Sequence, residues 1–135
     1  MTMVGMVSFD KIDKYWTCSN GAYDIIFSGI YALYIDRSIA SNICNVLEPQ
    51  VGQHIHRCWP AKYEYWNGQA PEFLLFTDFP KAQQLELLRA SEAMLRDVVA
   101  DRVDPGLQLP RNRRDLYVEL MSELTALMHE ELAVP

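Results

Sequence analysis

The triplet His54-x-His56-x-Cys58 is the arrangement of residues best suited to chemistry in this sequence. Alternate side chains of a strand point to one face, so neighbouring members would lie about 7 Å apart there. Imidazole and thiolate are ligands that zinc and other soft divalent ions prefer. The H-x-H spacing is also common by chance, and we favour an exposed or edge strand that binds no metal. The alternative is a zinc site, with Cys44 or Glu64 as a fourth ligand.

Nucleophilic catalysis is a second use of the same residues. Cys58 with His54 or His56 as the base, or Cys18 with a distant His, would form a reactive pair if the thiol pKa were lowered. The sequence contains no glycine-rich phosphate loop and no serine nucleophile elbow. We therefore expect a protein that is not an enzyme and needs no cofactor. A metal-binding protein or enzyme centred on this segment, with zinc as the cofactor, is the alternative.

Three arginines, Arg111, Arg113 and Arg114, form the only basic cluster of the chain. They lie where the last helix is predicted to begin, and positive charge there opposes the helix dipole. An anionic partner, such as a phosphate or an acidic protein surface, would explain this placement. The alternative is a solvated surface patch that pairs with nearby aspartates.

Tyr and Trp are concentrated in the first half of the chain, where nine of them occur within the first 66 residues. Core packing explains most of them, but a small core has limited room for so many large rings. Both side chains combine apolar area with a polar group, which suits interfaces. We therefore predict a surface that contacts another protein or a second copy of the chain, formed by Trp59, Tyr63, Tyr65 and Trp66.

The secondary structure of the first half is ambiguous. Residues 8–16 are predicted to form one or two helical turns, followed by a turn at 18–21. Residues 22–35 fit either a hairpin divided at Ser28-Gly29 or one amphipathic helix, and we favour the hairpin. Further predicted elements are a helix from Asp36 or Ser38 to Leu47, and strands at 53–59, 61–66 and 72–77.

The last part of the chain predicts two helices. The first begins at Thr77 or Asp78, with Pro80 in its first turn, and its apolar stripe contains Leu85, Leu88, Leu95 and Val99. The second follows Pro110, ends near Leu132, and has an acidic outer face (Asp115, Glu119, Ser122, Glu123, Glu130 and Glu131). Their short linker makes them antiparallel neighbours. The predicted fold class is α+β, with a small, mostly antiparallel sheet and a C-terminal antiparallel helical pair; a mostly α-helical fold is the alternative.

Length and composition limit the remaining possibilities. A chain of 135 residues is expected to form one domain, with an aromatic mixed part at 1–79 and the helical pair at 80–135. The net charge of −6 disfavours binding to nucleic acid or to an anionic membrane. No segment has the pattern of a signal peptide or a membrane helix. Three cysteines without C-x-x-C spacing favour the cytoplasm.

These features together predict a small acidic cytoplasmic protein that acts by protein–protein binding. An inhibitor, an immunity or anti-defence protein, and a subunit of a larger assembly all fit this description. The prediction depends on the missing catalytic motifs, the acidic balance and the abundance of interface-type aromatic residues.

Overall fold

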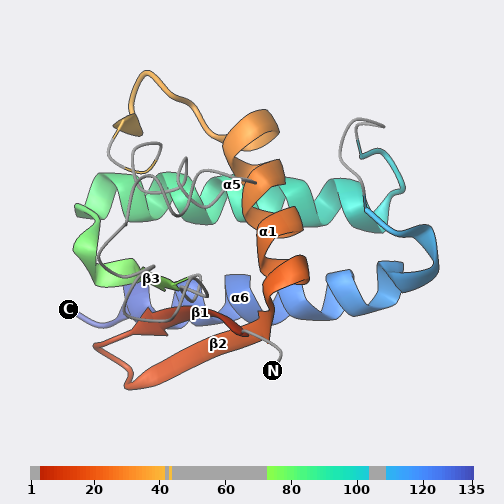
Figure 1. Cartoon of the computed structure of the whole chain (residues 1–135). Coiled ribbons are helices and arrows are strands. Elements are labelled where there is room, and N and C mark those ends of the chain that lie inside the picture. Colours follow the sequence, from red (N-terminus) through yellow and green to blue (C-terminus); the bar gives the residue numbers. More distant parts are fainter. Residues whose placement is uncertain (1–3, 42, 44–72, 104–108) are drawn as a thin grey trace, which may run out of the picture.

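The computed structural model describes residues 4–41, 43, 73–103 and 109–135, whose arrangement is shown in Figure 1. The elements in chain order are β1 (Val4–Phe9), β2 (Lys14–Ser19), α1 (Asn20–Gly29), the π-helical turn η1 (Ile30–Tyr34), β3 (Phe73–Leu75), the 3₁₀ turn η4 (Phe76–Asp78), α5 (Lys81–Val99), the 3₁₀ turn η5 (Arg111–Arg113) and α6 (Arg114–Ala133). A small sheet is combined with three helices. The α+β fold predicted from the sequence is therefore confirmed.

The sheet has three strands in the described residues, in the order β2-β1-β3. β1 and β2 form an antiparallel hairpin in which Val7 lies opposite Trp16. β1 also pairs with β3 in the parallel sense, and there Val7 lies opposite Leu74. The sheet is therefore mixed, and the antiparallel ladder is the longer of the two, with six residue pairs against three.

Residues 8–16 contain the end of β1, a turn and the start of β2, so the prediction of helical turns there is wrong. The Asp13 N–H donates to the Asp10 carbonyl at 3.3 Å and closes the turn. Asp13 has a positive φ of 52°, a left-handed conformation that aspartate adopts more readily than most residues. The hairpin therefore depends on turn chemistry that is hard to recognise without a glycine.

β1 and β2 turn one face of the hairpin toward the core. Gly5, Val7 and Phe9 are buried at every second position of β1, which is the period of a strand. Trp16 extends this face on β2, and its indole N–H donates to the Leu120 carbonyl of α6 at 2.8 Å. The sheet is thereby attached to a helix more than a hundred residues further along the chain.

The segment from residue 22 to 34 is helical, so the predicted hairpin is wrong and its helical alternative is right. Ser19 caps α1, because its hydroxyl accepts the Ala22 N–H at 3.2 Å. The buried residues of the segment recur at helical spacing: Ala22, Tyr23, Ile26, Phe27 and Ile30. Aromatic and β-branched residues favour strands intrinsically, but the packing of one whole helix face outweighs that preference.

Gly5 allows α1 to lie close to β1. A Cβ atom at this position would overlap the Cβ and ring of Tyr23. The Tyr23 ring lies 4.5 Å from the Phe27 ring and 6.4 Å from the Trp16 ring, measured between centroids. Trp16 and Tyr23 are only 2% and 0% exposed, so these two of the nine early Tyr and Trp residues belong to the core.

The helix widens where α1 passes into η1. The Ile35 N–H donates to the Ile30 carbonyl five residues earlier, at 3.0 Å, which is the hydrogen bond of a π-helix. Gly29 lies directly before this wider turn. The predicted helix from Asp36 or Ser38 to Leu47 is described only at residues 36–41 and 43. Residues 37–39 form a turn, so the helix does not begin at Asp36 or Ser38 as predicted, although Ser41 and Ile43 are helical. The predicted strands at 53–59 and 61–66 lie outside the described residues. The predicted strand at 72–77 is the shorter β3, followed by η4.

α5 and α6 form the antiparallel C-terminal pair that the sequence predicts (Figure 1). The start of α6 meets the end of α5, because the Arg114 Nε–H donates to the Val98 carbonyl at 3.0 Å. Pro80 is the N-cap of α5 and does not lie in its first turn as predicted. Its carbonyl accepts the N–H groups of Gln83 and Gln84 at 2.9 and 3.0 Å. Neither Thr77 nor Asp78 caps the helix, since both belong to η4.

The buried face of α5 is rotated relative to the predicted stripe. Leu85 and Val99 were expected in the core but are 49% and 51% exposed. Two residues on the buried face are polar, Glu86 and Ser91, and the Ser91 hydroxyl donates to the Leu87 carbonyl of its own helix at 2.8 Å. A hydrophobic count misses this face because a small or internally hydrogen-bonded polar residue can be buried at low cost.

The acidic outer face of α6 also needs one correction. Glu131 was placed on it but is only 1% exposed, and its Oε1 accepts the Lys11 N–H at 2.6 Å. The neighbouring Glu130 remains at the surface and forms an ion pair with Lys14 at 2.9 Å. The β1–β2 hairpin is therefore anchored to the last turns of α6.

Candidate functional site

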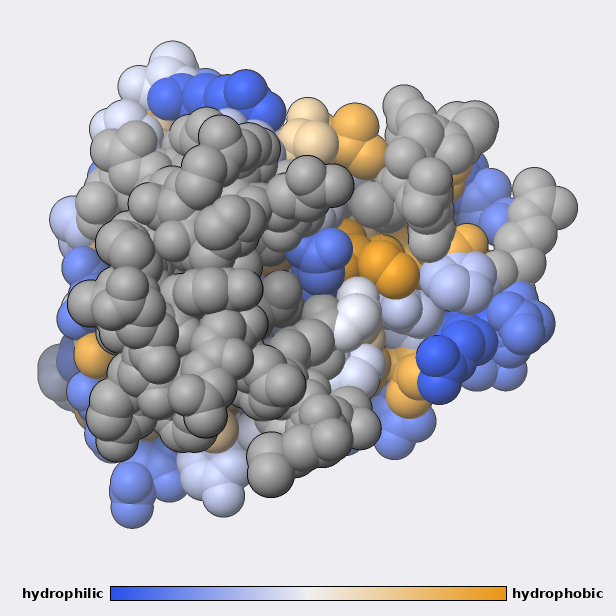
Figure 2. Space-filling model, viewed as in Figure 1, coloured by the Kyte–Doolittle hydropathy of each residue, from blue (hydrophilic) through white to orange (hydrophobic). Residues whose placement is uncertain are grey.

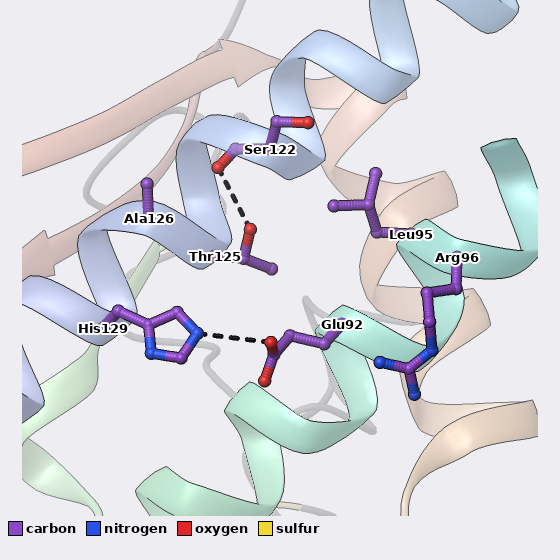
Figure 3. A pocket seen from close by; sticks show the side chains of 7 residues that line it. All are labelled: Glu92, Leu95, Arg96, Ser122, Thr125, Ala126 and His129. Atoms are coloured by element: carbon purple, nitrogen blue, oxygen red, sulfur yellow. Dashed lines mark hydrogen bonds and ion pairs between the residues drawn. The ribbon is translucent and has the colours of Figure 1, made fainter.

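A groove of about 350 Å³ lies between α5 and α6, and it is a candidate site formed by described residues. Figure 3 shows the side chains around it. α5 supplies three of them and α6 supplies four: Glu92, Leu95 and Arg96, and Ser122, Thr125, Ala126 and His129.

Helical periodicity explains why these residues gather at one groove. Side chains three or four positions apart share a face of a helix, and the lining residues of each helix follow that spacing. The antiparallel pairing then brings the middle of α5 against the second half of α6. Sequence reasoning did not identify this site, because it depends on how the two helices are rotated about their axes. His129, an exposed histidine on a predicted helix, was the available signal.

The polar end of the groove is an interhelical contact between Glu92 and His129. The His129 Nε2 lies 3.2 Å from the Glu92 Oε2, and the two side chains are 58% and 38% exposed. One Glu92 oxygen is thereby fixed by the partner helix. Arg96 lies one turn further along α5 and forms no ion pair with any described residue.

The floor of the groove is apolar. The Thr125 hydroxyl donates to the carbonyls of Met121 and Ser122, each at 3.0 Å, and Figure 3 shows its methyl group turned toward the opening. Leu95 and Ala126 continue this surface. Polar groups at the rim around an apolar floor are typical of a small-molecule binding site.

The groove suits binding better than nucleophilic catalysis. His129 with Glu92 resembles a base held by a carboxylate, and Ser122 is the nearby hydroxyl. However, Ser122 and His129 are seven positions apart on one helix, a rise of about 10 Å. A base must lie within hydrogen-bond reach of the hydroxyl that it activates, so this pair does not form a catalytic dyad.

A second polar cluster lies where the end of η1 meets α5. Glu86 is 6% exposed. Its Oε2 accepts the Arg89 Nε–H at 3.0 Å. Its Oε1 accepts the Arg89 Nη2–H and also the Asp36 N–H, the latter at 3.1 Å. Arg89 also donates to the Tyr34 carbonyl at 2.6 Å. The hydrogen bonds from Arg89 lower the pKa of Glu86, although burial acts in the opposite direction. The Ser38 hydroxyl and N–H likewise lower the pKa of Asp36. The cluster joins the widened turn to α5 and is structural.

The arginine cluster predicted from the sequence is divided by the structure. Arg114 donates to the carbonyls of Val98 and Val99 and so satisfies the C-terminal end of α5, where a positive charge is favourable. Arg113 is exposed, and Arg111 begins η5. Burial raises the pKa of Tyr117, and the Arg113 charge partly offsets this rise. Partner binding by Arg111, Arg113 and Arg114 stays a prediction.

The other predicted site residues lie outside the described residues. These are the zinc ligands and the aromatic contact residues: His54, His56, Cys58, Trp59, Tyr63, Tyr65 and Trp66. Both hypotheses therefore stay predictions. Within residues 4–41, 43, 73–103 and 109–135, no group of three or more His, Cys, Asp or Glu side chains could hold a metal ion.

One further surface is the second face of the sheet. Tyr15 lies on this face and is 66% exposed. It pairs with Ser8 of β1, and Ser8 pairs on its other edge with Leu75 of β3. Met6 and Thr17 form the next pair along the hairpin. The contacts of α1 and α6 described above are with the first face. In the part of the chain that the structure describes, this second face therefore has an exposed aromatic residue, Tyr15, on the β1–β2 strand pair.

Comparison with known proteins gives no assignment: no family model, curated protein or solved structure matches this chain. None of the described helices combines the length and apolar character needed to cross a membrane. The function is therefore inferred from the geometry of the chain's own residues.

Proposed function

We propose that this protein acts in the cytoplasm by binding another protein, as an inhibitor, an immunity or anti-defence protein, or a subunit of a larger assembly. The observation that supports this proposal best is Tyr15, a residue that is 66% exposed and lies on the second face of the sheet. Tyr is enriched at interface hot spots, because it contributes apolar area and a hydroxyl at a small entropic cost.

The neighbours of Tyr15 fit the same role. Leu75 and Met6 are half-buried on this face, while Ser8 and Thr17 supply hydroxyl groups. An apolar centre with polar groups around it is the usual composition of an interface. Figure 2 shows hydrophobic and hydrophilic residues intermixed on the part of one face that is not drawn in grey.

Site-specific crosslinking tests the proposal. A photoreactive phenylalanine analogue at position 15 is expected to give a crosslinked product in the native cell. The same analogue at Ala100, an exposed position after α5, is expected to give none. Tyr15→Ser should weaken partner binding by roughly tenfold or more, while the free energy of unfolding changes by less than about 0.5 kcal/mol.

A second copy of the chain is the other partner that the experiment can reveal. In that case, sedimentation should show a dimer for the parent protein and a monomer for Tyr15→Ser. Equal crosslinking from positions 15 and 100, or unchanged partner binding by Tyr15→Ser, would contradict the proposal.

A further inference from the structure

Glu92 and Arg96 carry opposite charges but do not form an ion pair with each other. They lie four residues apart on α5, the spacing at which Glu and Arg usually form an intrahelical ion pair. Instead, the Glu92 Oε2 contacts His129, and Arg96 forms no ion pair with any described residue. Figure 3 shows Glu92 turned across the groove while Arg96 extends along α5. Two opposite charges are thus both available at the rim of one groove.

Each of the two charged groups retains hydrogen-bonding capacity. The Glu92 Oε1 accepts no hydrogen bond from the described residues, since only its Oε2 is engaged. The Arg96 guanidinium has donors that no described acceptor uses. His129 acts here as a positioning residue, because it fixes one carboxylate oxygen and leaves the other open.

We propose that the groove binds a small zwitterion with an apolar side chain, the chemistry of a free α-amino acid. The ammonium group would bind the Glu92 Oε1, and the carboxylate would bind the Arg96 guanidinium. The side chain would cover the floor formed by Leu95, the Thr125 methyl group and Ala126. The groove volume of about 350 Å³ lies at the small end of the range for ligand sites.

Charge complementarity selects this occupant over simpler ones. A ligand with only a carboxylate would be attracted by Arg96 but repelled by Glu92. A ligand with only an ammonium group would be attracted by Glu92 but repelled by Arg96. A ligand that carries both charges compensates both residues at once. Because the groove is open to water, each ion pair contributes no more than about a tenfold gain in affinity, and we expect a dissociation constant in the millimolar range.

L-phenylalanine is a suitable probe, titrated at neutral pH into the ¹⁵N-labelled full chain and followed by NMR. Saturable shifts are expected for amides at 92–96 and 122–129. N-acetyl-L-phenylalanine lacks the ammonium group and L-phenylalaninamide lacks the carboxylate, so both should bind roughly tenfold more weakly.

Two variants test the assignment of the charges. Glu92→Gln and Arg96→Gln should each weaken L-phenylalanine binding by roughly tenfold, and Arg113→Gln, an exposed arginine outside the groove, should leave it unchanged. All three positions lie at the surface, so unchanged spectra away from the groove will show that the fold is kept.

Three results would overturn the proposal. The first is the lack of saturable shifts at tens of millimolar ligand, and the second is saturable shifts located elsewhere in the chain. The third is equal binding of the zwitterion and either blocked analogue, which would show that only one charge is recognised.

Discussion

The buried carboxylate of Glu86 offers the sharpest test of how this fold is held together. Glu86→Gln keeps the shape of the side chain but removes its charge. In the native protein, Glu86 is 6% exposed and accepts hydrogen bonds from Arg89 and from the Asp36 N–H. The variant would place an amide N–H₂ against the guanidinium of Arg89, so at least one of these bonds is lost.

The expected loss follows from the exposure of the two partners. Removing one member of a fully buried ion pair costs about 3–5 kcal/mol. Arg89 is 53% exposed, so water can solvate its guanidinium after the substitution. We therefore expect a reduced loss of about 2 kcal/mol in the free energy of unfolding. With a slope of about 2 kcal/mol per molar urea, the urea midpoint should fall by about 1 M.

The loss should also depend on pH. The pKa of Glu86 is lowered in the folded state from its ordinary value of 4.5. A lowered pKa means that the carboxylate stabilises the fold fully above pH 4.5, and that this contribution disappears as the pH falls through the folded-state pKa. Gln does not titrate, so the difference between parent and variant should be largest at neutral pH and should close in acid.

Urea unfolding, followed by tryptophan fluorescence over a pH series, measures this difference. Glu92→Gln is the matched control, because Glu92 is 38% exposed and its contact with His129 is a surface pair. Its loss should stay below about 0.5 kcal/mol. Equal stability of parent and Glu86→Gln at neutral pH, or a difference that persists unchanged in acid, would refute the reasoning.

Three further predictions concern packing and helix ends. Gly5→Ala should destabilise the fold by about 1–3 kcal/mol in thermal unfolding, because the added methyl group overpacks against α1. Gly21 has open space around it, so Gly21→Ala should increase the free energy of unfolding by up to about 1 kcal/mol. Equal effects of the two substitutions would contradict this packing. Glu131→Ala should cost about 1–3 kcal/mol in urea unfolding, because it removes a side chain that is only 1% exposed and leaves the Lys11 N–H without its acceptor. An unchanged urea midpoint would argue against that bond. Arg114→Ala should lower the free energy of unfolding by about 1 kcal/mol, because it leaves the carbonyls at the end of α5 without their donor. Arg113→Ala should leave the stability unchanged. Similar losses from both variants would contradict the capping role of Arg114.

The C-terminal helices were predictable because their signal is local. Apolar residues recur at helical spacing over more than four turns in each, and a short linker fixes their antiparallel order. Their rotation was not predictable from hydrophobicity, since Glu86 and Glu131 are buried through specific hydrogen bonds. The same reason hid the groove, which exists only once the two helix faces are correctly oriented.

The first half was harder because its local preferences conflict with its packing. Residues 22–34 are rich in strand-forming side chains, yet Ser19 starts a helix and Gly5 makes room for it. Close approach between two segments cannot be read from either one alone. The strand pair that includes residues 8–16 was missed because its turn uses Asp13 with a positive φ in place of a glycine.

The anchoring of the hairpin to α6 has a consequence for synthesis in the cell. The hydrogen bond from Lys11 to Glu131 joins residues 120 positions apart, and the bond from Trp16 to Leu120 joins residues 104 positions apart. At about 5–20 residues per second, the ribosome takes about 6–24 s to cover that distance. During this interval the apolar face of the nascent hairpin has no α6 to cover it. Chaperones that bind exposed strands would therefore have their best opportunity before translation of the last helix is complete.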